Sequence, residues 1–120
     1  MKSPSPEQYV EHALPLIPDL LQLLDRDPLS PTAGCFDRQY WHYKTMDFPS
    51  GMSQECVLPL ALVFRNDFTG NPYFEQERVR EWVLSGIHFA RRSSHPDGSC
   101  DDYYPFERAL GAAAYSLNAM

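Results

Sequence analysis

Residues 34–40 read Gly-Cys-Phe-Asp-Arg-Gln-Tyr, and residues 98–104 read Gly-Ser-Cys-Asp-Asp-Tyr-Tyr. The two stretches share glycine, aspartate and tyrosine at the same three places, and the second begins 64 residues after the first. Each follows a segment with helical periodicity and precedes a segment of almost wholly apolar residues. This repeated order predicts two helical hairpin units. Such units stack, and each then buries apolar faces that a single pair of helices would leave exposed.

The first unit is predicted to span about residues 5–65. Ser5 and Pro6 are typical of a helix start, and apolar residues then recur at three- and four-residue steps as far as Leu24. Prolines at positions 15 and 18 predict a kink, since each removes a backbone donor. After an aromatic stretch without a sustained period, a second helix is expected to begin between positions 50 and 57. Its residues are apolar on nearly every side, which predicts that protein surrounds it.

The second unit is predicted to span about residues 72–120. Asn71 is a candidate cap for an amphipathic helix from about Pro72 to Ser93. A further apolar helix is expected to open at Pro105. The inner helices of two such units need neighbours on both flanks. We therefore expect further repeats in a longer protein or self-association through the exposed inner helices. The fold class is predicted to be all-α: two αα-hairpin repeats forming a single helical domain over residues 1–120, or a fragment of an incomplete α/α toroid.

Composition limits the partners of the chain. The 120 residues are 43% apolar and 22% charged, as in an ordinary globular protein, and their formal net charge is −6. An acidic surface makes nucleic acid and anionic membrane unsuitable partners through bulk electrostatics. The longest apolar stretch, Val57–Phe64, is too short to span a bilayer. With no secretory signal at the N-terminus, we expect a cytoplasmic protein, while a periplasmic location stays open if the chain is an excised fragment.

Two segments resemble the N-terminal region of bacterial heparinase II/III-like proteins. They are residues 34–44 with Asp47-Phe48-Pro49, and residues 97–105 with Glu107 and Arg108. The resemblance implies an incomplete α/α toroid followed by a β-sandwich, and cleavage of uronic-acid-containing polysaccharides by β-elimination. In that family the catalytic Asn or His and Tyr lie deeper in the toroid than the segment matched here. The catalytic residues of this chain are therefore unknown and are expected to lie mostly outside it.

Several side chains in or beside the repeated motifs could line a sugar cleft. Aromatic rings stack on sugars, and cationic or imidazole groups can neutralise a uronate or carry a proton. The candidate substrate-binding residues are Arg38, Trp41, His42, Tyr43, Tyr103, Tyr104 and Arg108. The structural alternative is that these aromatic loops cap helices and seal one end of a helical array.

Other site types have weaker signals. Asp37 and Asp101 are most simply loop-bracing acceptors, because a short carboxylate readily binds backbone donors, and a pair of catalytic carboxylates is the lesser reading. Three cysteines without a Cys-x-x-Cys pattern do not suggest a disulfide framework or a zinc site. His88 and His95 lack the spacing of metal ligands, so no metal and no cofactor are expected.

The sequence thus leads to a first hypothesis and two rivals. The first is the N-terminal helical segment of a heparinase II/III-like protein that acts on acidic polysaccharide or oligosaccharide by β-elimination, and so an enzyme only as part of a longer protein. The alternative is a non-catalytic helical-repeat module that binds a protein partner. A third reading is a different toroid enzyme, such as a glycoside hydrolase.

Overall fold

The computed structural model describes residues 2–43 and 48–120, and all regular secondary structure within them is helical. An isolated bridge between Cys100 and Ala109 is the one extended pairing in this part of the chain. The prediction of a helical protein without strands is therefore confirmed for the described residues. None of their helices is long and apolar enough to cross a membrane.

The first helical segment is broken where the prolines predict. α1 (Pro6–Ala13) begins with a complete capping box between Ser5 and Gln8, gives way to the 3-10 turn η1 (Leu14–Leu16), and resumes as α2 (Ile17–Leu23). The short helix α3 (Arg38–Tyr43) follows in the aromatic stretch for which no helix was predicted. A 3-10 segment η2 (Gly51–Cys56) then leads directly into α4 (Val57–Arg65), which matches the predicted second helix.

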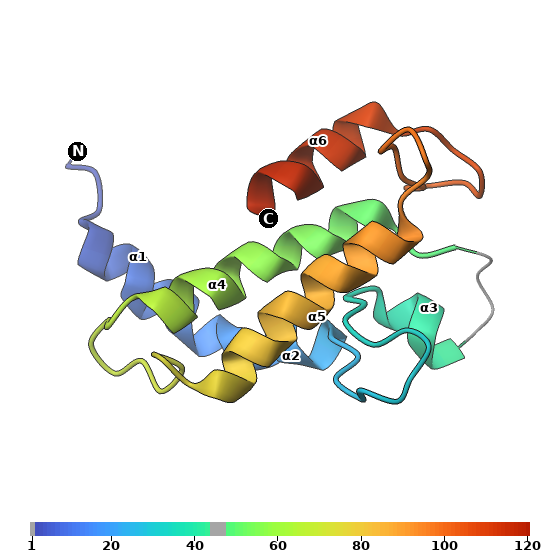
Figure 1. Cartoon of the computed structure of the whole chain (residues 1–120). Helices are drawn as coiled ribbons and strands as arrows, with labels where there is room; N and C mark the ends of the chain where they lie inside the picture. The colour runs from blue at the N-terminus through green and yellow to red at the C-terminus, as the bar shows by residue number, and fades with distance from the viewer. Residues whose placement is uncertain (1, 44–47) are drawn as a thin grey trace.

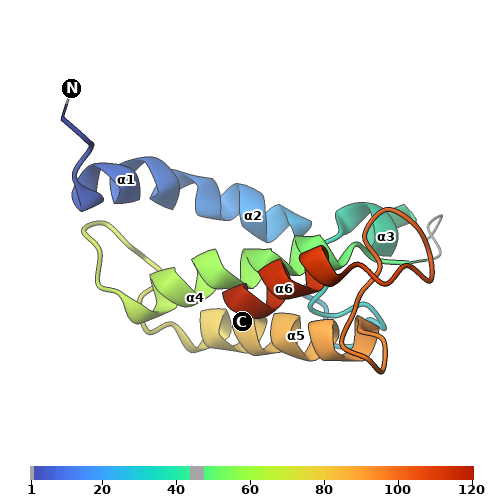
Figure 2. The same ribbon diagram turned by 90° about the horizontal axis from the view of Figure 1, so that it is seen from above.

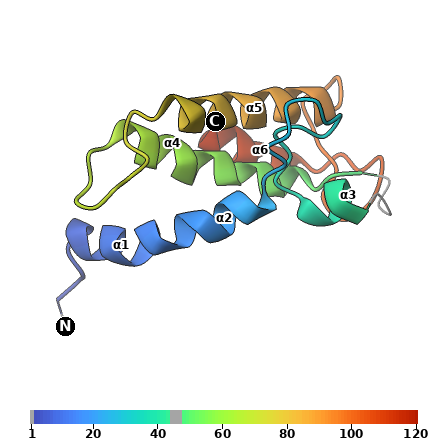
Figure 3. The same ribbon diagram turned by 90° about the horizontal axis from the view of Figure 1, so that it is seen from below.

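α4 lies at the centre of the molecule, with α5 (Glu77–Ser93) packed along it (Figure 1). Seen from above, α1 and α2 follow the opposite flank of α4, and α6 (Leu110–Ala119) lies over η2 and α4 (Figure 2). The view from below places α3 and its adjoining loops at one end of the molecule, opposite the N-terminus (Figure 3). The core where these helices meet contains Ile17, Leu21, Leu24, Phe36, Val57, Leu60 and Val63.

α4 and α6 each leave an apolar flank exposed. On α4, Leu58 is 39% and Leu62 is 48% exposed, as expected for an inner helix that lacks a neighbour on one flank. On α6, Tyr115 and Leu117 are more than two-thirds exposed. An almost wholly apolar hollow of about 310 Å³ lies between α1 and α4.

α5 begins later than predicted, although Asn71 does cap the turn that follows it: its Oδ1 accepts from Tyr73 N at 2.9 Å. Its side-chain amide also donates to the carbonyl oxygens of Val63 and Asn66, at 2.7 and 2.8 Å, and so closes the end of α4. Glu75, at φ 52°, then turns the chain before the helix starts at Glu77. The sequence alone does not show whether a residue between two helices caps the end of the first helix or the start of the second.

α6 also begins later than predicted, at Leu110 instead of near Pro105. Phe106 has φ 59°, a left-handed conformation that breaks a helix at that point. The carboxylate of Glu107 is directed back to the preceding backbone, where it accepts from the amides of Asp102 and Tyr103. These contacts form a turn in place of the predicted first helical turn.

Candidate functional site

The two repeated motifs form corners with the same backbone hydrogen bonding. We call residues 34–37 the first corner and residues 98–101 the second corner. Their glycines have φ of 88° and 85°, in the left-handed region that favours glycine. The residue after each glycine, Cys35 or Ser99, is completely buried.

In each corner a residue just after the preceding helix exchanges two backbone hydrogen bonds with the motif. Gly34 N donates to Asp25 O at 2.9 Å, and Asp25 N donates to Cys35 O at 2.8 Å. In the second corner Gly98 N donates to His95 O at 2.9 Å, and His95 N donates to Ser99 O at 2.8 Å. The two motifs therefore have the same local geometry although their loops differ in length.

Ser50 and Gly51 join the two corners. The amide of Ser50 donates to the carboxylate of Asp37 at 2.9 Å, and the amide of Gly51 donates to the carbonyl oxygen of Asp101 at 2.7 Å. The Ser50 hydroxyl also donates to the carboxylate of Asp102 at 2.9 Å. Three hydrogen bonds from two consecutive residues thus hold segments 64 positions apart at one end of the molecule.

Asp37 and Asp101 brace this end, as predicted, but through different atoms. The Asp37 carboxylate accepts from Ser50 and, at 3.4 Å, from the amide of Tyr40 at the start of α3. The Asp101 carboxylate lies 2.7 Å from Nε2 of His95, while its backbone carbonyl accepts from Gly51. Both carboxylates are engaged with the protein itself, which does not favour the reading of a catalytic pair.

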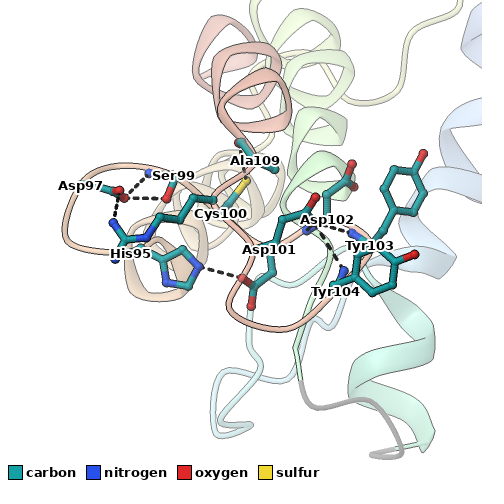
Figure 4. A network of polar contacts seen from close by, with 11 residues as sticks. His95, Asp97, Ser99, Cys100, Asp101, Asp102, Tyr103, Tyr104 and Ala109 are labelled. Atoms are coloured by element: carbon teal, nitrogen blue, oxygen red, sulfur yellow. Dashed lines mark hydrogen bonds and ion pairs between the residues drawn. The ribbon is translucent and has the colours of Figure 1, made fainter.

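The second corner continues into an exposed aromatic turn (Figure 4). Tyr103 and Tyr104 are 78% and 71% exposed, so their rings are free to contact a ligand. The Glu107 carboxylate accepts from the backbone amides of Asp102, Tyr103 and Tyr104 at 3.0, 2.9 and 3.4 Å. These bonds, that of Tyr103 first, lower the pKa of Glu107 and hold the backbone that carries both rings.

Arg108 is occupied by an ion pair with Asp97 at 2.5 Å. The hydroxyl and then the backbone amide of Ser99, followed by Arg108, hold the pKa of Asp97 down at about 2. This arrangement fixes the loop before the second corner. It offsets part of the Arg108 charge through one guanidinium nitrogen, while the side chain itself is 72% exposed.

α3 is tied to the end of α2. Nε1 of Trp41 donates to Leu23 O at 3.1 Å, Arg38 donates to Gln22 O at 3.4 Å, and the Arg38 guanidinium lies 5.8 Å from the centre of the Trp41 ring. His42 and Tyr43 belong to α3 by their backbone, but their side chains, like Lys44 and Asp47 of the resemblance, lie outside the described residues. The structure thus places the predicted residues at one end of the molecule and gives Arg38 and Trp41 structural contacts there.

The three cysteines are free thiols, and their pKa values disfavour a nucleophilic thiolate. Burial raises the pKa of Cys35 to about 12 and also raises the pKa values of Cys56 and Cys100. In the parts of the chain that the structure describes, no group of three or more His, Cys, Asp or Glu residues is arranged to hold a metal ion.

Gln54, which the sequence interpretation passed over, is the buried link between the first corner and α5. Its amide nitrogen donates to Gly34 O and Gly86 O at 3.1 and 2.9 Å, and its oxygen accepts from Phe36 N at 2.9 Å. The sequence carries no distinct signal for it, because Ser53 and Glu55 on either side are also polar and only the fold shows which of the three is buried.

Fold and site together define a helical protein with two similar glycine–aspartate corners joined at one end. No family model matches the chain, and neither the curated proteins nor the solved structures give a significant match.

Proposed function

We propose that the chain is the N-terminal helical segment of a heparinase II/III-like protein that binds acidic, uronic-acid-containing polysaccharide. Cleavage by β-elimination is assigned to residues mostly outside this chain. The proposal includes the finer architecture predicted from the sequence: two hairpin units belonging to an incomplete α/α toroid. The resemblance of the two corner segments to that family supports it.

One structural observation carries the sugar-binding part of the proposal. The two corners meet through Ser50 and Gly51, and the turn that follows them presents Tyr103 and Tyr104 on a backbone fixed by Glu107. Exposed rings lose little conformational entropy on binding a ligand when the backbone that carries them is already held in place. Two adjacent tyrosines at the joined end therefore provide a platform on which sugar rings can stack.

Calorimetric titration with oligogalacturonate tests this platform. The double variant Tyr103→Ala and Tyr104→Ala is expected to weaken binding about tenfold, as loss of an exposed aromatic anchor does. Tyr9→Ala is the matched control, because Tyr9 is also exposed, at 61%, but lies on α1 away from the corners. Equal affinity in both variants rejects the tyrosine platform.

Elimination is tested on a longer protein that contains this chain. Unsaturated uronate products absorb in the ultraviolet, so their formation from heparan-, alginate- and hyaluronan-type substrates reports the reaction directly. Absence of product from all three rejects the lyase assignment, whereas the titration judges sugar binding separately.

The exposed apolar flanks of α4 and α6 favour a second candidate, a helical module that binds a protein. Leu58 and Leu62 on α4 and Leu117 on α6 are the main apolar side chains involved. Concentration-dependent association in sedimentation experiments, abolished by Leu58→Glu and Leu117→Glu together, would favour this module over sugar binding by the monomer.

A further inference from the structure

A groove runs along α5, between that helix and the loop that precedes the first corner. It consists of two hollows of about 640 and 440 Å³. Both are lined by Pro28, Glu81 and Ser85, so they adjoin at the middle of the groove. Neither tyrosine of the platform lines it, and the groove is a separate site from the one described above.

The loop that forms one wall of the groove is held in place by buried polar contacts. The Asp25 carboxylate, which is 7% exposed, accepts from the hydroxyls of Ser30 and Thr32 at 2.6 Å each. On the other side, Arg92 of α5 donates to the carbonyl oxygen of Ala33 at 3.0 Å. The wall is therefore preformed, which reduces the entropy lost when a ligand binds.

The charges of the groove differ from those of the chain as a whole. The chain has a formal net charge of −6, yet the groove is lined by four arginines, Arg26, Arg78, Arg91 and Arg92, against Asp25 and Glu81. Arg26 lies over the Trp82 ring, and Arg92 donates to Ala33 O. Arg80 pairs with Glu77 at 2.8 Å and does not line the groove. Arg78 lines one hollow and Arg91 the other, and neither has an ion pair or a side-chain hydrogen bond within the described part of the chain. An unpaired guanidinium is suited to bind a carboxylate through two parallel hydrogen bonds.

The spacing of these charges restricts the ligand. Positions 78 and 91 are separated by about 20 Å along a helix that rises 1.5 Å per residue. Glu81 lies where the two hollows adjoin, has no hydrogen-bond partner within the described residues, and repels a carboxylate placed there. A polymer with a carboxylate on every unit is disfavoured opposite Glu81. One whose charged and neutral units alternate can place a neutral unit there.

We propose that this groove binds an acidic polysaccharide in which uronic acids alternate with neutral sugars, with the uronates at Arg78 and Arg91 and a neutral sugar opposite Glu81. The inference rests on the proposed function and assigns its carboxylate recognition to α5. The platform end is poorly suited to that task, because Asp97 engages Arg108 there and Asp102 and Glu107 add negative charge.

Calorimetric titration compares the affinity of the chain for two ligands. One is a hyaluronan oligosaccharide, whose uronates alternate with neutral sugars, and the other is polyglutamate, which is charged at every unit. The double variant Arg78→Gln and Arg91→Gln is expected to weaken hyaluronan binding at least about tenfold, the usual effect of losing charged hydrogen bonds. Arg80→Gln is the matched control on the same helix, expected to change affinity less than about twofold, as for an exposed ion pair. Glu81→Gln is expected to strengthen polyglutamate binding more than hyaluronan binding. Thermal unfolding of each variant checks that its fold is intact.

Three results would overturn the groove assignment. Equal weakening by the double variant and by Arg80→Gln would mean that hyaluronan responds only to overall charge. Tighter binding of polyglutamate than of hyaluronan to the unmodified chain would indicate an acidic protein partner. Loss of hyaluronan binding in Tyr103→Ala and Tyr104→Ala, with no effect of the arginine variants, would reject the groove and keep the platform. The reverse pattern would reject the platform and keep the groove.

Discussion

At the scale of single residues, the corner glycines contribute in two separable ways. Gly34 and Gly98 both need a left-handed backbone, but their surroundings differ. A Cβ built on Gly34 would collide with the backbone carbonyl of Ser85 on α5, whereas one built on Gly98 would meet nothing within 4 Å. The first glycine therefore permits a close helix contact as well as a turn, and the second permits the turn alone.

This difference predicts unequal costs for the same substitution. Gly98→Ala is expected to lower the free energy of unfolding by about 1–2 kcal/mol, the cost of a left-handed conformation for a residue with a Cβ. Gly34→Ala is expected to cost more, about 3 kcal/mol or above, because the helix contact must also open. Urea denaturation measures both. A loss for Gly98→Ala as large as that for Gly34→Ala would contradict the open space at the second corner.

At the scale of elements, η2 is positioned by one buried amide. Gln54 is 2% exposed and bonds to two groups of the first corner and one of α5. A side chain of similar size without polar atoms would fill the space and leave Phe36 N and Gly34 O without these bonds. Buried polar groups left in this way cost more than the hydrogen bond itself contributes.

Gln54→Leu is therefore expected to lower the free energy of unfolding by about 2–4 kcal/mol. Gln39→Leu, an exposed position on α3, is the control and is expected to change it by less than about 0.5 kcal/mol. Chemical denaturation of the two variants gives the comparison. A small effect at Gln54 would mean that the corner and α5 are held mainly by apolar packing.

The elements that the sequence predicted well are those whose chemistry is local. Ser5 with Pro6 starts α1, and the prolines of η1 and α2 break the first segment, because each acts on its own turn. The starts of α5 and α6 were predicted wrongly, since Asn71 and Glu107 bond to groups earlier in the chain that only the tertiary structure reveals.

The candidate site was likewise predicted from the sequence only where its chemistry is local. The glycine–aspartate motifs predicted two similar corners, and the structure has them. That Ser50 and Gly51 would join the corners could not be predicted, because the joining bonds use backbone groups that every residue possesses. The groove along α5 was missed for a related reason: a helix with both charge signs is typical of a solvent-exposed face, and a loop about 50 residues earlier in the chain supplies the other wall.

At the scale of the whole molecule, the joint between the corners also determines how α6 is attached. α6 packs mainly on η2, and the hydroxyl of Ser116 donates to Gly51 O at 2.6 Å. Elements that share few contacts with the rest of a protein open locally at lower free energy. α6 and the second corner are thus expected to open before α4 and α5.

Two glycine-to-alanine substitutions test this attachment with opposite expected signs. A Cβ on Gly51 would lie 2.7 Å from the Cβ of Cys100, so Gly51→Ala is expected to force the joint apart and lower the opening free energy of α6 by about 1–3 kcal/mol. Gly111 is on α6 with nothing within 4 Å of a built Cβ, so Gly111→Ala is expected to raise the opening free energy of α6 by about 0.5–1 kcal/mol through helix propensity.

Amide hydrogen exchange resolved by residue separates the opening of α6 from that of α5. Gly51→Ala should accelerate exchange in α6 while leaving α5 nearly unchanged, because α5 keeps its packing on α4. Equal acceleration in both helices would mean that the molecule opens as one cooperative unit and that the joint is not its weak point.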